Sequence, residues 1–206
     1  MFALVESGSI TKYLSGNRGI TLNDLQYPRA IYTLWTEAER NAIGIYSIVY
    51  DDSNKEDEQW YINTNQTYTY DASAGTVTAT YGSATAKAHA DTTWSQDDED
   101  DGNLPDNKSV GDVKVEGLKT KLIRTVKLQA AAELANTDWY ITRNAEESTA
   151  VPSAITTHRR LVRSRQATME TSITNASNTA ALETLYAYTT DSDGVTSRPL
   201  AEIPTL

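Results

Sequence analysis

A chain of 206 residues, 39% of them hydrophobic, can build one large domain or two small ones, and no apolar run approaches the roughly 18 residues of a membrane span. The absence of cysteine excludes disulfide bonds and thiolate metal sites. A net charge of −10 argues against nucleic-acid binding, which depends on neutralising phosphates. Residues 1–112 carry 18 acids and 7 bases, whereas residues 113–206 carry 10 acids and 11 bases, which favours two distinct parts.

The first part of the chain is predicted to be rich in β-strands. A hairpin turn is expected at residues 6–9, where Glu-Ser-Gly-Ser separates two short apolar–polar runs. Thr36 is placed to cap a short helix with glutamates in its first turn, and Gly44 ends that helix. The β-branched and aromatic run 45–50 then predicts a strand.

Two further strands are predicted in the Thr/Tyr-rich runs 59–70 and 75–82. Their alternation is polar on both faces, with Trp60 on one face and Tyr61 on the other. Such a sheet is expected to leave one face open to water or to a partner. Trp60 and Tyr61 are therefore candidate partner-binding residues, and stacking on a sugar is a second use of the same side chains.

Residues 95–112 are predicted to form a solvated linker. The segment holds seven acids, one lysine, and glycine and proline interruptions, so charge repulsion keeps it extended. A calcium loop is the alternative, because five of the acids are consecutive. These acids lack the alternating spacing, the central glycine and the terminal glutamate that a calcium loop uses, so no metal site is expected.

The second part is predicted to be helical. Residues 113–135 contain no proline and place an apolar side chain every fourth residue, and a second helix is expected over 153–175, with Pro152 at its start. Ser177 is placed to cap a short third helix that runs to Tyr188. The apolar stripes of the two long helices consist of Leu118, Leu122, Val126 and Ala130, and of Ile155, Val162, Met169 and Ile173.

The connection between these helices, residues 136–151, is predicted to be a long loop. Trp139 and Tyr140 are expected to anchor it by packing against the helices. Four arginines follow within seven residues: Arg159, Arg160, Arg163 and Arg165. Three uses of the arginines stay open, namely pairing with Asp138, Glu146 or Glu147, clamping a partner's carboxylates, and contacting nucleic acid.

No catalytic, cofactor or metal site is indicated by the sequence. The histidines His89 and His158 lie far apart in the chain, and His158 is surrounded by arginines that oppose its protonation. No serine lies in a nucleophile-elbow context. The loop Ser15–Gly19, SGNRG, has glycines but neither the P-loop nor the dinucleotide-binding spacing.

One longer pattern combines several of these features. An alanine-rich helix ends in L-A-x-T-D-W, a polar loop leads to a proline, and the next helix contains R-x-x-V-R. The pattern resembles the C-terminal segment of bacteriophage tail-fibre assembly and tail-associated proteins. Residues 1–13 and 34–52 are also similar to openings of small phage tail-module proteins. The pattern falls on Leu134, Ala135, Thr137, Asp138, Trp139, Pro152, Arg159, Arg160 and Arg163.

This resemblance implies a non-enzymatic protein of a phage tail, made in the host cytoplasm and located in the virion tail, with other tail proteins as partners and oligomers possible. A structural part at the baseplate or fibre attachment is the first expectation, because the Tyr/Thr-rich strands and the acidic segment depart from the usual assembly chaperone. A fibre-assembly chaperone and a glycan-binding module are the alternatives. The partner-binding candidates are Trp60, Tyr61, Trp139, Tyr140, Arg159, Arg160 and Arg163.

The expected architecture is α+β. An antiparallel β-rich domain (1–94) is followed by the acidic linker (95–112), a helical hairpin with a third short helix (113–190) and a C-terminal tail (191–206). Neither nucleic acid nor a membrane is an expected partner.

Overall fold

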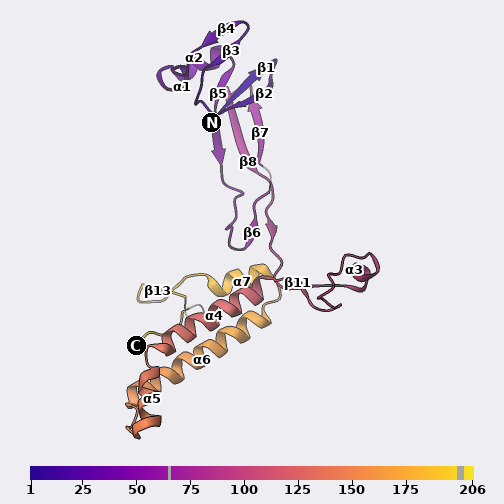
Figure 1. Ribbon diagram of the computed structural model, residues 1–206. Coiled ribbons are helices and arrows are strands. Elements are labelled where there is room, and N and C mark those ends of the chain that lie inside the picture. Colours follow the sequence, from indigo (N-terminus) through magenta and orange to yellow (C-terminus); the bar gives the residue numbers. More distant parts are fainter. Residues whose placement is uncertain (65, 199–201) are drawn as a thin grey trace. The chain divides into compact units, whose positions relative to one another are not determined.

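The computed structural model describes residues 1–64, 66–198 and 202–206, and it confirms the α+β class. The chain divides into two compact units, Met1–Thr85 and Ala86–Leu206 (Figure 1). This division falls before the acidic segment, so residues 95–112 belong to the second unit and do not separate the two. Of the predicted tail, residues 199–201 lie outside the described residues.

The first unit is built on a curled five-stranded sheet. All neighbouring strands are antiparallel except β5 and β8, which run parallel with Ile48 opposite Val77, so the prediction of a purely antiparallel sheet is wrong. Parallel neighbours need a long crossover, and residues 52–75 provide it. The strand order is β2 (Ser9–Leu14), β1 (Phe2–Glu6), β5 (Ile45–Asp51), β8 (Thr76–Tyr81) and β7 (Gln66–Asp71).

The edge strands β2 and β7 approach one another, and the ring centroids of Tyr13 and Tyr68 lie 4.6 Å apart there.

Each face of the sheet carries its own apolar cluster. Ala3, Val5, Ile48, Val77 and Ala79 form one cluster, and Leu4, Leu14, Ile31, Tyr32 and Ile45 form the other. The second cluster includes the helix α1 (Ile31–Leu34) and is flanked by the hairpin of β3 (Ile20–Leu22) and β4 (Leu25–Tyr27).

The predicted turn and cap of this unit are confirmed. Ser7 and Gly8 both have positive φ, which is the backbone that a two-residue hairpin turn requires. Thr36 and Glu39 form a reciprocal capping box at the start of α2 (Glu37–Ala42). Gly44 follows the helix with φ +81°, and an added Cβ would lie only 2.7 Å from the carbonyl oxygen of Val5, so the position requires glycine.

The single strand predicted over residues 59–70 is two strands, β6 (Tyr61–Ile62) and β7. The short β6 pairs with β9 (Thr85–Ala86). In β7, Tyr68 and Tyr70 pack on the first apolar cluster, while the alternating Thr67 and Thr69 are exposed. The open face of this strand therefore presents threonine, and its tyrosines are partly buried.

The acidic segment is an excursion between two paired strands of the second unit. β10 (Thr92–Thr93) pairs antiparallel with β11 (Val113–Val115), and the residues between them include a short helix, α3 (Gln96–Asp100). The long helix expected from residue 113 begins only at Leu118, because β11 occupies residues 113–115 and Gly117 caps the helix.

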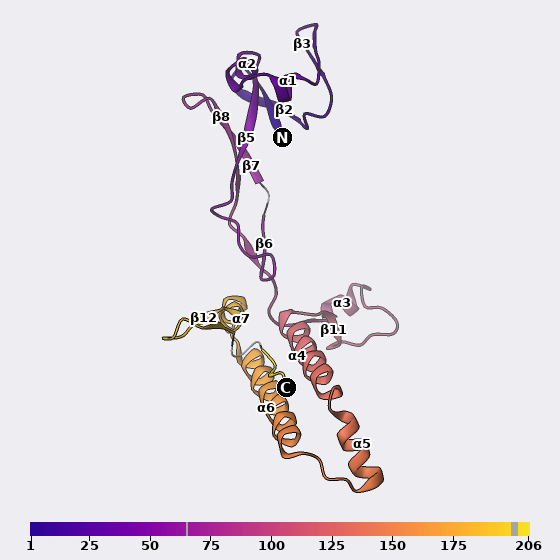
Figure 2. The same cartoon turned by 90° about the vertical axis from the view of Figure 1, so that its left-hand side faces the viewer.

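Two antiparallel helices, α4 (Leu118–Ala135) and α6 (Ser153–Asn175), form the hairpin of this unit and lie side by side in both views (Figure 2). All four predicted core residues of α6 are buried, whereas in α4 only Val126 and Ala130 are, with Leu118 and Leu122 partly covered. Asn178, not Ser177, caps the third helix, α7 (Thr179–Tyr186). A final hairpin pairs β12 (Thr189–Thr190) with β13 (Thr196–Ser197).

Candidate interaction site at the end of the helical hairpin

A helix, α5 (Asp138–Glu147), occupies the segment that was predicted to be a loop. It follows α4 after a two-residue break, continues beyond the end of α4 (Figure 2), and ends at Ser148 in the left-handed conformation. None of its side chains is buried. A ten-residue helix without a buried face is not stable on its own, so its position depends on contacts at its first turn.

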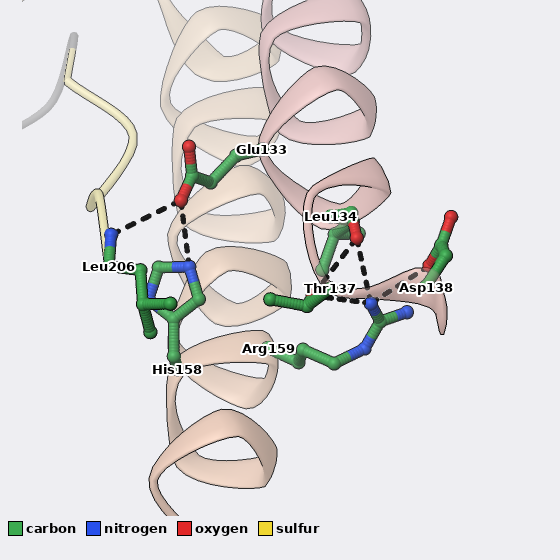
Figure 3. A network of polar contacts seen from close by, with 7 residues as sticks. All are labelled: Glu133, Leu134, Thr137, Asp138, His158, Arg159 and Leu206. Atoms are coloured by element: carbon green, nitrogen blue, oxygen red, sulfur yellow. Dashed lines mark hydrogen bonds and ion pairs between the residues drawn. The ribbon is translucent and has the colours of Figure 1, made fainter. Parts of the chain in front are cut away.

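Arg159 of α6 supplies these contacts (Figure 3). Its Nη1 atom lies 2.8 Å from the carbonyl oxygen of Leu134, 2.7 Å from Oγ1 of Thr137 and 2.8 Å from Oδ1 of Asp138. The Arg159 residue is 7% exposed and Thr137 is also buried. The predicted pairing of this arginine with Asp138 is therefore present, and it joins the end of α4, the start of α5 and the second turn of α6.

The other arginines of the cluster do not share this environment. Arg160 and Arg163 are exposed and form no ion pair within the described ranges of the chain. Glu146 and Glu147, the other predicted partners, likewise form no ion pair in the part of the chain that the structure describes. Of the three arginines predicted to bind a partner, Arg159 is buried and structural, whereas Arg160 and Arg163 are solvated, so the three do not form a continuous basic stripe.

Trp139 does not anchor the segment, contrary to the prediction, because it is 53% exposed. Its ring stacks on that of Tyr140 with centroids 3.9 Å apart, and the guanidinium of Arg143 lies 4.7 Å from the Trp139 centroid. Ile141 is also exposed. Arg143 was not among the predicted site residues. Its spacing of four residues from Trp139 was a usable signal, because residues four apart on a helix are neighbours.

A second polar contact joins the same two helices. Nε2 of His158 lies 2.9 Å from Oε1 of Glu133, and this oxygen also accepts a hydrogen bond of 3.2 Å from the backbone N–H of Leu206 (Figure 3). His158 faces a carboxylate, although its sequence neighbours are arginines. Its ring is buried, and no serine or threonine hydroxyl bonds to it among the described residues, so the contact links α4, α6 and the C-terminal segment.

Trp60 and Tyr61, the remaining candidates, belong to the first unit. Trp60 is only 3% exposed, so its ring face is covered by the protein, and Tyr61 is partly buried in β6. The predicted use of Trp60 as a stacking surface for a sugar or a partner is therefore wrong. Trp139 and Tyr140 lie together on α5, and only Trp139 is largely exposed.

These features define an α+β protein of two units, with an exposed aromatic helix fixed by a buried arginine. No protein-family model matches the chain, and no curated protein or solved structure is significantly similar to it. Within the described residues, no helix is long and apolar enough to cross a membrane. In the same ranges, no group of three or more histidine, aspartate or glutamate side chains is arranged to hold a metal ion.

Proposed function

We propose that this chain is a non-enzymatic structural protein of a bacteriophage tail, at the baseplate or the tail-fibre attachment, where it links neighbouring tail proteins. The proposal rests on the resemblance of residues 134–163 to tail-associated proteins. Its main structural support is that three residues of that pattern, Thr137, Asp138 and Arg159, meet in one contact. The pattern thus has a physical role: it fixes α5.

The surface that α5 presents is suited to protein recognition. Trp139 combines a large exposed apolar face with a ring N–H, and tryptophan is among the residues that contribute most to the free energy of protein association. Arg143 above the ring adds a cation that a partner's carboxylate can approach. Because Arg159 fixes the first turn of α5, the surface is ordered before a partner binds, which lowers the entropic cost of binding.

A tail-fibre assembly chaperone is the second candidate. It is favoured by the large apolar side chains that α4, α5 and α6 leave exposed, because a chaperone of this kind covers apolar surface of an incompletely assembled fibre. These side chains are Leu128, Trp139, Ile141 and Leu161. Trp60, the residue expected to stack on a sugar in the glycan-binding alternative, is buried and is not accessible for stacking.

Peptide mass spectrometry of washed, mature particles of the phage that encodes the chain separates the two candidates. A structural part is expected at a fixed ratio to the other tail proteins. If the chain is missing from mature particles but binds the fibre protein on co-expression, the structural role is overturned and the chaperone role is supported.

The same particles test the proposed surface. Trp139→Ala should weaken binding to the neighbouring tail protein by roughly 30-fold, since loss of an interface tryptophan typically costs about 2 kcal/mol or more. Leu128→Ala is the matched control, because Leu128 is exposed on α4. Equal incorporation of Trp139→Ala and wild type would exclude α5 as the contact.

A further inference from the structure

The loop Ser15–Gly19, which leads from β2 to β3, borders a small cavity in the first unit. The cavity has a volume of about 80 Å³, and the loop, the end of β2 and Tyr32 of α1 line it. This volume is enough for a few water molecules or one small tetrahedral anion, and too small for a nucleotide. The proposed tail function makes no use of this cavity.

The cavity is lined by positive charge. Lys12 and Arg18 line it, no acidic residue does, and neither cation forms an ion pair with another described residue. This arrangement is unusual for the unit, because residues 1–85 contain 10 acids and only 5 bases. Two of the five bases therefore lie at one cavity without a carboxylate to neutralise them.

Neutral donors add to these charges. Tyr32 is buried, its hydroxyl bonds to no other residue in the described part of the chain, and burial raises the pKa of this hydroxyl so that it stays a proton donor. The backbone N–H groups of residues 15–18 also donate no backbone hydrogen bond within the described ranges. Free loop N–H groups beside cations are a common arrangement for binding anions in proteins.

The loop is held in place by close packing at its glycines. Gly16 has φ +73°, and an added Cβ would lie 3.0 Å from the Phe2 ring. An added Cβ at Gly19 would lie 2.5 Å from the carbonyl oxygen of Tyr27. The loop backbone therefore packs closely against the Phe2 ring at Gly16 and against the Tyr27 carbonyl at Gly19, and a larger side chain at either position would disturb this packing.

We propose that this cavity binds a single tetrahedral oxyanion, phosphate or sulfate, held by Lys12, Arg18, the Tyr32 hydroxyl and the loop N–H groups. The anion is bound either as the free ion or as the terminal group of a phosphate ester. The sequence SGNRG lacks the spacing of the P-loop and of the dinucleotide-binding loop, so the proposed ligand is one anion and not a chain of phosphates.

The test is a titration of the full ¹⁵N-labelled chain with inorganic phosphate, followed by amide chemical shifts at ionic strength held constant with sodium chloride. Saturable shifts are expected at residues 15–19. Lys12→Gln and Arg18→Gln should each weaken binding by about 10-fold, because each removes one charge-assisted hydrogen bond. Arg29→Gln is the matched control: Arg29 is an exposed base of the same unit that does not line the cavity.

The spectra of each variant also report whether it is folded. The proposal is overturned if wild type shows no saturable shift, if the Lys12→Gln/Arg18→Gln double variant binds as tightly as wild type, or if Arg29→Gln loses as much affinity as the other two. A parallel titration with phenyl phosphate distinguishes a free phosphate ion from the terminal group of a phosphate ester. Binding of both ligands shows that the cavity accepts a terminal phosphate group, and binding of phosphate alone shows that it accepts only the free ion.

Discussion

Arg159 brings a charged donor to three acceptors at the junction of α4 and α5. The carbonyl of Leu134 is among the last four of α4 and also accepts hydrogen bonds from the backbone N–H and the hydroxyl of Thr137. A cation near a helix C-terminus is favourable. The buried hydroxyl of Thr137 is a second acceptor. Asp138 is the third, but its side chain is 61% exposed, so solvent screens this ion pair and it contributes less.

Replacing Arg159 by Met should release α5. The substitution keeps the apolar stem and removes the charged donor from two buried or partly buried acceptors, at a cost of about 2–3 kcal/mol. Amide hydrogen exchange should accelerate over residues 136–147. Arg160→Met, on the exposed neighbouring residue, should change stability by less than about 0.5 kcal/mol. Unchanged protection of α5 in Arg159→Met would show that the stack around Trp139 holds the helix instead.

At the scale of single elements, the acidic excursion shows how a short helix is held. The five residues of α3 are too few for a stable isolated helix. Ser95 and Asp98 form a capping box, and Nζ of Lys114 on β11 lies 2.5 Å from Oδ1 of Asp98 and 4.5 Å from the ring centroid of Trp94. The excursion is therefore tied to the strand pair at its base.

The Lys114 contact and the capping box lower the pKa of Asp98 from 3.8 to about 2. Because the folded pKa is the lower one, these contacts stabilise the excursion fully above pH 3.8, and that stabilisation is lost as the pH falls from about 4 to about 2. An NMR titration of the Asp98 carboxyl carbon should give a midpoint near 2. Lys114→Met should raise it, while Lys108→Met, at an exposed lysine of the same excursion, should not. A shift of equal size in both variants would indicate only the general loss of positive charge.

Local signals in the sequence predicted most elements, and distant contacts account for the differences. The Glu-Ser-Gly-Ser turn, the Thr36 cap and the apolar stripe of α6 each depend on residues close together in the chain, and each is confirmed. The parallel pairing of β5 with β8 and the contact of Lys114 with Asp98 join residues far apart in the chain. A short stretch of sequence does not contain that information. The first part was therefore predicted to be antiparallel throughout, and the acidic excursion was predicted to be a linker.

The features of the candidate site also divide into those that local sequence predicts and those that depend on distant contacts. The pairing of Arg159 with Asp138 could be proposed from charge alone, but charge could not select Arg159 over its neighbours. That selection depends on the helix face: Arg159 lies beside the buried Val162, whereas Arg160 points to solvent. The exposure of Trp139 was missed because α5 has an interrupted apolar period and reads as a loop.

At the scale of the whole molecule, each unit has its own core. The first unit is centred on β-strand residues such as Val77 and Ala79, and the second on Val126, Val162 and Met169 between α4 and α6. Independent cores predict independent unfolding, because loss of one set of contacts leaves the other set intact.

Val126→Asp should therefore unfold the hairpin and spare the sheet. Val126 is 1% exposed, and a carboxylate in its place loses about 2 kcal/mol of apolar burial and adds the larger cost of an unpaired buried charge. Together these costs approach the whole stability of a small domain. Hydrogen exchange of the full chain should show lost protection over residues 118–175 and native protection over 1–85.

Val77→Asp should give the converse pattern, and Leu128→Asp, at an exposed position of α4, should leave both units protected. Simultaneous loss of protection in both units after Val126→Asp would mean that the chain unfolds as one cooperative body. In that case a partner bound at α5 would also act on the stability of the sheet. If the two units unfold separately, a partner bound at α5 changes the stability of the helical unit alone. A change in stability passes only between contacts that are lost together.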